Sequence, residues 1–251
     1  MRKCIGAAAG LLLSIAFTGA SSAHAADVPD GPPVTWTGFY LGGNAGYAWS
    51  NADFSIKQTG SWVGSLADLA AATNGSVDLN GKTFGGQLGY NLQQGIWVWG
   101  IEADLGSLST DASRAGGSIP ITSIVSFSQR AEVSWMASIR GRLGITVDRA
   151  LLYATAGVAF ADWDLEMRMT AAGDSTAVFR ESSVQAGWII GGGIAYVVDQ
   201  NWSVKAEYLY ADFGDAKGSS IFPPPANANF THDHKVDLET QILRAGLNYT
   251  F

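Results

Sequence analysis

The segment Leu243–Phe251 alternates apolar and polar side chains without a break. The apolar members are Leu243, Ala245, Leu247, Tyr249 and Phe251, and the residues between them are Arg244, Gly246, Asn248 and Thr250. A period of two is typical of a β-strand with one face toward an apolar medium and the other toward polar groups. An exposed edge strand of this kind invites aggregation, whereas a closed barrel pairs every strand on both sides. The pattern therefore predicts a strand of a transmembrane β-barrel.

Similar alternation divides the preceding chain into seven further segments, which gives about eight strands in all. They are residues 36–49, 81–93, 96–108, 130–147, 151–165, 182–198 and 201–213. In 130–147 we place Val133 and Trp135 on the apolar face, opposite Ser134 and Ser138. Segment 151–165 is apolar on both sides, so the pattern does not orient it.

The connections alternate in length. Gln94-Gly95, Asp148-Arg149 and Asp199–Asn201 read as tight hairpin turns. Long polar segments lie between them, near residues 50–80, 109–129, 166–181 and 214–235. Outer-membrane barrels have short periplasmic turns and longer outer loops. The predicted fold is therefore all-β, a transmembrane antiparallel up-and-down barrel of about eight strands.

The amino-terminal residues predict export. Arg2 and Lys3 precede an uncharged apolar stretch, and Ala23-His24-Ala25 supplies small residues for cleavage, as in a secretory signal peptide. We therefore expect residues 1–25 to be removed, 26–35 to form an extended periplasmic lead, and 36–251 to form the barrel. The single cysteine, Cys4, lies in the removed segment, so the mature chain should contain neither disulfides nor reactive thiols.

Composition supports a membrane location and argues against nucleic acid as a partner. Charged residues make up 15% of the chain, below the roughly 25% of an average soluble domain. The nine tryptophans suit the aromatic girdles of a membrane barrel. The net charge of −7 becomes more negative when Arg2 and Lys3 are removed, which disfavours binding to phosphate backbones.

Four motifs resemble the small outer-membrane immunogenic proteins of Gram-negative bacteria, which are grouped with the opacity proteins among OmpA-like barrels. The motifs are residues 36–47, 85–91, 205–210 and 244–251. The resemblance implies an eight-stranded barrel in the cell outer membrane. It also implies insertion by the outer-membrane assembly machinery, which reads the terminal aromatic strand, here with Tyr249 and Phe251. Members of this family often have no assigned molecular activity.

A group of charged residues occupies the inferred inward positions: Glu102, Asp104, Arg140, Arg142, Lys205, Glu207 and Arg244. These side chains could line a narrow ion path or hold a gate closed. Alternatively, they form a packed interior of paired charges, because a barrel of about eight strands is just wide enough for side chains to fill. We favour the packed interior, since an unpaired charge at that depth is costly.

Two weaker signals suggest metal binding or catalysis. His232 and His234 share one face of an extended segment and could hold a metal, and Ser219 and Ser220 lie in the same region as a possible partner hydroxyl for His232. No further ligand is close in sequence and no nucleophile motif accompanies the serines. We expect a solvated outer loop, and no catalytic residue, cofactor or metal site.

Three function classes remain open. The favoured one is a structural and surface-interaction barrel of the cell envelope, which contacts outer-membrane lipid and lipopolysaccharide and presents its loops to host or other surface ligands. Residues 61–73 of the first outer loop, with Trp62 and Leu66 at helical spacing, are a candidate contact surface. The alternative is a small porin-like diffusion channel for polar solutes. A soluble exported barrel of lipocalin type would need an apolar lumen, which the inward charges argue against.

Overall fold

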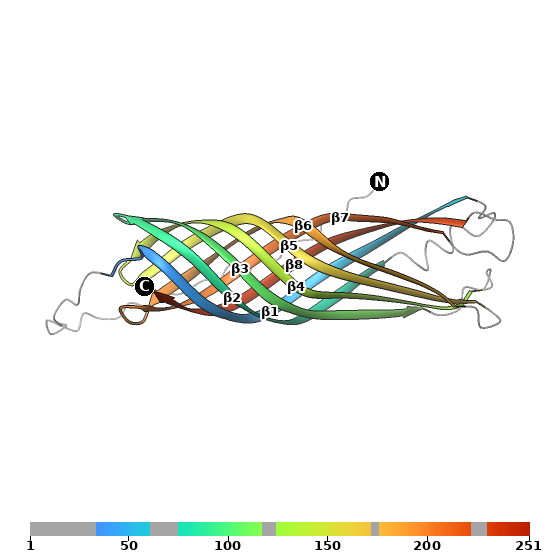
Figure 1. Cartoon of the computed structure of the whole chain (residues 1–251), viewed down its shortest axis with the longest axis horizontal. Coiled ribbons are helices and arrows are strands. Elements are labelled where there is room, and N and C mark those ends of the chain that lie inside the picture. The colour runs from blue at the N-terminus through green and yellow to red at the C-terminus, as the bar shows by residue number, and fades with distance from the viewer. Residues whose placement is uncertain (1–33, 61–74, 117–123, 172–175, 222–229) are drawn as a thin grey trace, which may run out of the picture. The chain divides into compact units, whose positions relative to one another are not determined.

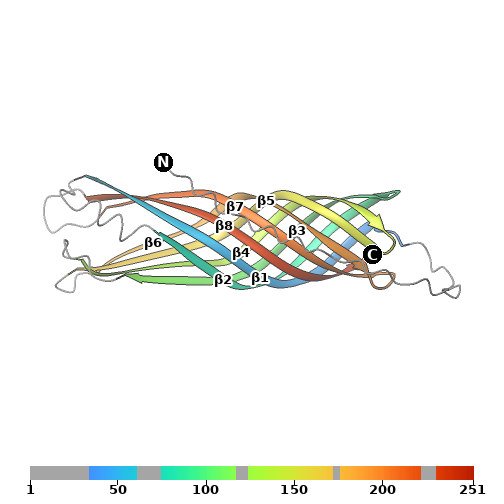
Figure 2. The ribbon, with the colours of Figure 1, turned by 180° about the vertical axis from the view of Figure 1, so that it is seen from behind.

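A computed structural model describes residues 34–60, 75–116, 124–171, 176–221 and 230–251. These ranges form a closed antiparallel barrel in which each strand pairs with its neighbours in sequence and the last pairs with the first (Figures 1 and 2). The eight strands that they contain are β1 (Gly38–Gly60), β2 (Gly75–Gln94), β3 (Trp97–Gly116), β4 (Ile124–Val147), β5 (Ala150–Ala171), β6 (Thr176–Val197), β7 (Trp202–Ile221) and β8 (Phe230–Thr250). Within these ranges we find no helix of sufficient length and hydropathy to cross a membrane. The predicted fold class is confirmed.

The three short connections lie where the sequence predicted them. β2 and β3 are joined through Gly95, and β4 and β5 through Asp148, both with positive φ (60° and 51°). Tight hairpin turns require this left-handed conformation, which glycine and aspartate tolerate better than most residues. The third turn joins β6 to β7, where the amide of Asp199 donates to the carbonyl of Trp202.

The strands are longer than predicted, at 20 to 24 residues. A barrel strand needs about 9–11 residues to cross the bilayer. The segments 50–80, 109–129, 166–181 and 214–235, which we expected to be loops, are largely strand continuations. The polar side chains of these segments indicate that the strands continue beyond the apolar layer of the membrane. Backbone pairing between strands does not require contact with lipid, so it can continue in water. The connecting residues 61–74, 117–123, 172–175 and 222–229 lie outside the described ranges, as does the predicted signal peptide.

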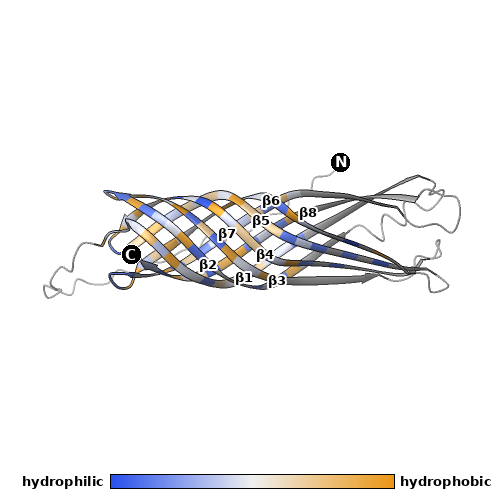
Figure 3. Cartoon of the chain, viewed as in Figure 1, coloured by the Kyte–Doolittle hydropathy of each residue, from blue (hydrophilic) through white to orange (hydrophobic). Residues whose placement is uncertain are grey.

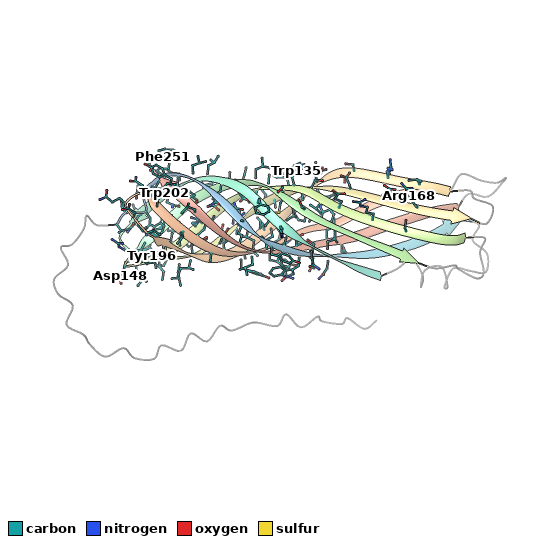
Figure 4. All side chains as sticks on the ribbon, turned by 90° about the horizontal axis from the view of Figure 1, so that it is seen from below. Trp135, Asp148, Arg168, Tyr196, Trp202 and Phe251 are labelled. Carbon is teal, nitrogen blue, oxygen red and sulfur yellow. The ribbon has the colours of Figure 1, made fainter. Side chains whose placement is uncertain are left out.

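Exposed apolar side chains on the outer face form an apolar belt, which includes Phe39, Leu41, Leu88, Ile101, Ile139, Ile190 and Leu247. Figure 3 shows hydrophobic and hydrophilic residues alternating along the strands. Trp202, Tyr196 and Phe251 lie near the end that also holds the turn residue Asp148, whereas Arg168 lies toward the opposite end (Figure 4). Trp202, Tyr249 and Phe251 form successive ring contacts at 5.1 and 5.2 Å. Farther along the wall, the ring centroids of Trp49 and Tyr208 lie 6.5 Å apart.

The structure orients β5, which the sequence left open. Leu151, Tyr153 and Trp163 face inward and are buried, while Leu152 and Phe160 are exposed on the outer face. Alternation on this strand is hidden in the sequence because the lumen next to it is also apolar.

The structure corrects the predicted face of Val133, which points inward and is fully buried, while its neighbour Ser134 is exposed. The register between β4 and β5 shifts between Val133 and Met136. An extra residue in one strand reverses the alternation beyond it. The prediction was wrong because period-two reasoning assumes an uninterrupted ladder.

Three layers of side chains fill the lumen, as β3 illustrates. Val98 belongs to an apolar cluster near the short turns, Glu102 and Asp104 follow, and Leu108 belongs to a second apolar cluster farther along. The turn-side cluster contains Trp36, Val98, Leu151, Tyr153, Ala195 and Val197. The far cluster includes Leu79, Leu108, Val133, Trp163, Ile189, Leu209, Phe213, Leu238 and Ile242.

Candidate functional site

The seven inward charges predicted from the sequence lie together in the middle layer of the lumen. β3 supplies Glu102 and Asp104, β4 supplies Arg140 and Arg142, β7 supplies Lys205 and Glu207, and β8 supplies Arg244. Each of these residues is at most 7% exposed. We call this set the charged layer. It contains three carboxylates and four cationic groups, so every carboxylate has more than one possible cationic partner.

Glu102 is a central acceptor of the charged layer. It lies opposite Arg140 in the β3–β4 register, and its carboxylate oxygens lie 2.5 Å from Arg140 and 2.6 Å from Arg142. Nζ of Lys205, from the far side of the barrel, donates to both oxygens at 3.0 Å. Arg244 of β8 lies 3.8 Å from the same carboxylate, so four cations on three strands converge on it.

Asp104 and Glu207 complete the pairing. Arg140 and Arg244 each contact both carboxylates, at 2.8 and 3.2 Å from Asp104 and at 3.1 and 2.8 Å from Glu207. Ser138 donates a further hydrogen bond to Asp104 at 2.6 Å and accepts one from Nε of Arg140 at 3.0 Å. In this low-dielectric interior such contacts are strong, and together they offset the large cost of removing the charges from water.

Two tyrosines that the sequence analysis did not single out border the charged layer. Tyr40 donates to Glu102 at 2.8 Å, and Tyr153 donates to Glu207 at 3.1 Å. The Arg142 guanidinium lies 4.1 Å from the centre of the Tyr153 ring, within the range of a cation–π contact. Their role was missed because the alternation pattern counts an inward tyrosine as an apolar residue and does not show which group its hydroxyl contacts.

Glycines make room for these rings. A Cβ added at Gly89 would lie 2.4 Å from the Tyr40 hydroxyl, and one at Gly193 would lie 2.7 Å from the Tyr153 hydroxyl. Gly89 lies between Tyr40 and Glu102 in the register, and Gly193 lies opposite Glu207. A bare backbone at these positions therefore lets each tyrosine reach its carboxylate across the neighbouring strand.

An uncharged hydrogen-bonded row accompanies the charged layer on β1, β2 and β8. Asn44 donates to Gln87 at 2.8 Å, and Gln87 donates to Asn248 at 2.6 Å. All three side chains are buried. They extend the polar packing from β8 across β1 and β2, which supply no residue of the charged layer.

The residues that precede β1 close the turn-side end of the lumen. The Trp36 side chain is 7% exposed and belongs to the cluster of Val98, Leu151 and Tyr153, with Val34 packed against it. The Trp36 amide donates to the side chain of Gln93 at 2.9 Å. We had predicted Trp36 as the first residue of a strand, but β1 begins at Gly38. Alternation cannot distinguish a strand residue from one that folds back into the mouth of its own barrel.

Other candidate residues are placed as follows. The side chains of His232, His234, Ser219 and Ser220, and the whole of residues 61–73, lie outside what the structure describes. Among the described residues, no group of three histidine, cysteine, aspartate or glutamate side chains could hold a metal ion. Tyr249 and Phe251 lie at the end of the barrel wall, with the Phe251 ring 77% exposed.

A second ionic group lies on the outer face of β5 and β6, beyond the apolar belt. Glu166 accepts hydrogen bonds from Arg168 and Arg180, the latter at 3.3 Å. The hydrogen bond from Arg168 and the charges of both arginines hold the pKa of Glu166 below its usual value. All three side chains are solvent-accessible, so these contacts are screened by water and contribute little to stability.

Comparison with known proteins gives consistent matches over the whole barrel. The model of a family described as outer membrane protein beta-barrel domain matches residues 12–251. The 31 kDa outer-membrane immunogenic protein of Brucella melitensis is 33% identical over 96% of this chain and 98% of its own length. The 22 kDa outer membrane protein of Rhizobium leguminosarum bv. viciae is 34% identical over 82% of this chain and 84% of its own. Among solved structures, the outer membrane protein OprG from Pseudomonas aeruginosa aligns with 86% of this chain and 96% of its own, at 13% identity and a TM-score of 0.48.

Proposed function

The chain belongs to the outer-membrane β-barrel protein family and resides in the outer membrane, and on this basis we propose that it is a closed structural and surface-interaction barrel without catalytic activity. In this role the barrel anchors a wall of long strands in the membrane and presents their far ends to the surroundings. The name of the Brucella relative as an immunogenic outer-membrane protein fits a chain whose outer segments are exposed to a host.

The filled lumen is the observation that carries this proposal. The charged layer lies between two apolar clusters, and its most central members, Arg140, Glu102 and Glu207, are each 1% exposed. A conducting pore needs a continuous polar path whose binding groups let ions leave again. Here every carboxylate is engaged by two or more cations, and apolar side chains cover the layer at both ends. This packing favours the closed barrel over the porin-like channel.

Conductance measurements on refolded protein in planar bilayers test the proposal. We expect the wild-type protein to insert without steady, porin-like conductance. Cysteine labelling provides a second measurement, because a mature chain starting after residue 25 contains no cysteine. Ser138→Cys, at a buried position beside the charged layer, should resist a membrane-impermeant thiol reagent, whereas Asp199→Cys, in an exposed turn, should react readily. Steady conductance together with rapid labelling of Ser138→Cys would support the diffusion channel instead.

The proposed partners follow from location. Outer-membrane lipid, including lipopolysaccharide, would contact the apolar belt and the polar wall beyond it. The assembly machinery of the outer membrane would recognise the aromatic strand that contains Tyr249 and Phe251, whose rings meet edge to face with their centroids 5.2 Å apart. Cross-linking during biogenesis, with a photoreactive residue in place of Phe251, would detect this contact.

A further inference from the structure

The ladder between β6 and β7 ends much lower on the barrel than the ladders on either side of it. It runs from Val197 paired with Ser203 to Trp188 paired with Asp212. β6 nevertheless stays paired with β5 as far as Thr176, and β7 stays paired with β8 as far as Ile221. Within the described ranges, residues 176–187 of β6 and 213–221 of β7 therefore pair on one side only.

A shorter interruption occurs on the opposite side of the barrel. Pairing between β2 and β3 ends at Asn80 and Asp111, although both strands continue. We call the places where neighbouring strands stop pairing the β6–β7 seam and the β2–β3 seam. Beyond these two seams the wall consists of two four-stranded sheets, β7–β8–β1–β2 and β3–β4–β5–β6 (Figure 1). The β6–β7 seam is the longer one and leaves the longer free edges.

Local sequence explains where the seam opens. Gly214 has a φ of 66°, its amide donates to the Asp212 side chain at 2.7 Å, and the β7–β8 register shifts between Asp212 and Asp215. A glycine in the left-handed conformation inside a register shift produces a bulge that bends its strand. Just below the bulge, a Cβ added at Gly187 would lie 2.2 Å from the carbonyl oxygen of Asp212. The two strands are thus tightly packed at Gly187 and part immediately above it.

The floor of the seam is closed. Phe213 is 4% exposed and its ring lies 6.2 Å from that of Trp163, in the far apolar cluster. Ile189 and Leu209, one step lower, are also buried in this cluster. The β6–β7 seam therefore ends on packed side chains and does not open into the lumen. Only the unpaired edges of the two strands are available there for binding.

The position of the free edges places them in water. An unpaired edge is not tolerated in contact with lipid, because its backbone groups would have no partner there. The β6–β7 pairing extends up to Trp188. On the outer face of the unpaired part of β6, exposed Ala186 and Val184 come first, and the exposed polar residues Ser182 and Arg180 follow. From Ser182 onward the free edge therefore lies beside polar side chains, beyond the apolar belt.

We propose that residues 176–186 of β6 form a docking edge for an extended polypeptide strand of an external partner. A free strand edge presents alternating N–H and C=O groups, which an incoming strand satisfies through its own backbone. The recognised chemistry is therefore the backbone of an extended peptide, with side chains at alternate positions adding selectivity. The cationic side chain of Arg180 and the anionic side chain of Glu166 both lie beside this edge. We therefore expect no preference for an acidic or a basic peptide. The proposal rests on the surface-interaction role and specifies the kind of partner.

Disulfide tethering of a probe peptide tests this edge. Ser182→Cys places a thiol on the outer face of the free part of β6. Asp164→Cys is the matched control, because Asp164 lies opposite Ser182 on β5, is also exposed, and belongs to a strand paired on both sides. The probes are two twelve-residue peptides of identical threonine- and valine-rich sequence, each with a central cysteine held as a mixed disulfide with a small alkyl thiol that can exchange reversibly. One has all its backbone N–H groups, and the other is N-methylated at every second residue on each side of the disulfide.

We expect Ser182→Cys to capture the unmethylated peptide at least ten-fold more favourably in equilibrium thiol exchange, and Asp164→Cys to capture both peptides equally. Tethering at Ser182→Cys should also slow amide hydrogen exchange along residues 176–186. Equal capture of the two peptides at Ser182→Cys, or unchanged exchange along β6, would overturn the proposal. Because the assay does not measure conductance, failure of the closed-lumen proposal would be seen separately in the bilayer experiment.

Discussion

Glu102 and Arg140 face each other across β3 and β4 and form a 2.5 Å ion pair in the middle of the lumen. The same carboxylate also binds Arg142, which lies two residues along β4 on the same face. The two arginines would repel each other without it. The β3–β4 register thus decides whether the charged layer is stable, because a slip of one residue would send these side chains to the lipid face.

Glu207→Ala should strongly destabilise the barrel. Glu207 contacts Arg140 and Arg244, and its loss leaves buried cations with less compensation. Removing one member of a buried pair typically costs about 3–5 kcal/mol. The measurement is denaturant unfolding in lipid vesicles. Glu132→Ala is the control, since its pair with Arg130 is exposed and should contribute less than about 1 kcal/mol. Equal effects of the two variants would show that the charged layer is not held by pairing.

Trp36→Ala should loosen the turn-side end of the lumen. The indole fills a cluster with Val98, Leu151 and Tyr153, and truncating a buried tryptophan costs about 3–5 kcal/mol. Because Tyr153 also bonds Glu207, we expect brief conductance openings in addition to a lower unfolding free energy. Trp202→Ala, a 43% exposed residue at the same end, should lower stability less and produce no openings. Identical behaviour of the two variants would contradict a sealing role for Trp36.

Much of this architecture could be predicted from the sequence, because each strand residue in the membrane part of a barrel faces either lipid or the lumen. Leu41 and Asn44 had to face lipid and lumen, and in the structure they do. The seven inward charges were identified for the same reason, since a charge such as Arg140 has no tolerable place on the lipid face.

The features that escaped the sequence analysis share a physical cause. The bulge near Ser134, the seam at Gly214 and the folding back of Trp36 all depend on backbone geometry at one or two residues, which side-chain alternation does not report. The length of the strands escaped because solvent on both faces removes the apolar signal beyond the belt. Tyr40 and Tyr153 escaped because their role depends on glycines in neighbouring strands.

Epitope tags should distinguish the two ends of the barrel. A tag inserted within residues 117–123, between β3 and β4, should be reached by antibody on intact cells, because the long ends of the strands face outward in the proposed topology. A tag at Asp148-Arg149 should require permeabilisation, since short turns face the periplasm in outer-membrane barrels. Staining of the second tag on intact cells would reverse the orientation and, with it, the accessibility of the β6 edge.

Leu88→Arg should weaken the barrel far more in a bilayer than in detergent. Leu88 is 59% exposed on the outer face of β2, between Phe84 and Tyr90, so an arginine there would face hydrocarbon. Such a substitution costs about 2–4 kcal/mol near the middle of the bilayer and less toward its margins. Leu88→Ala separates the loss of apolar contact from the burial of charge, because it removes the side chain without adding one. We expect unfolding in vesicles to show a clear difference between the two variants, and unfolding in micelles, where water reaches the wall more easily, to show a smaller one. Equal stability of both variants in vesicles would mean that this face of β2 does not contact lipid.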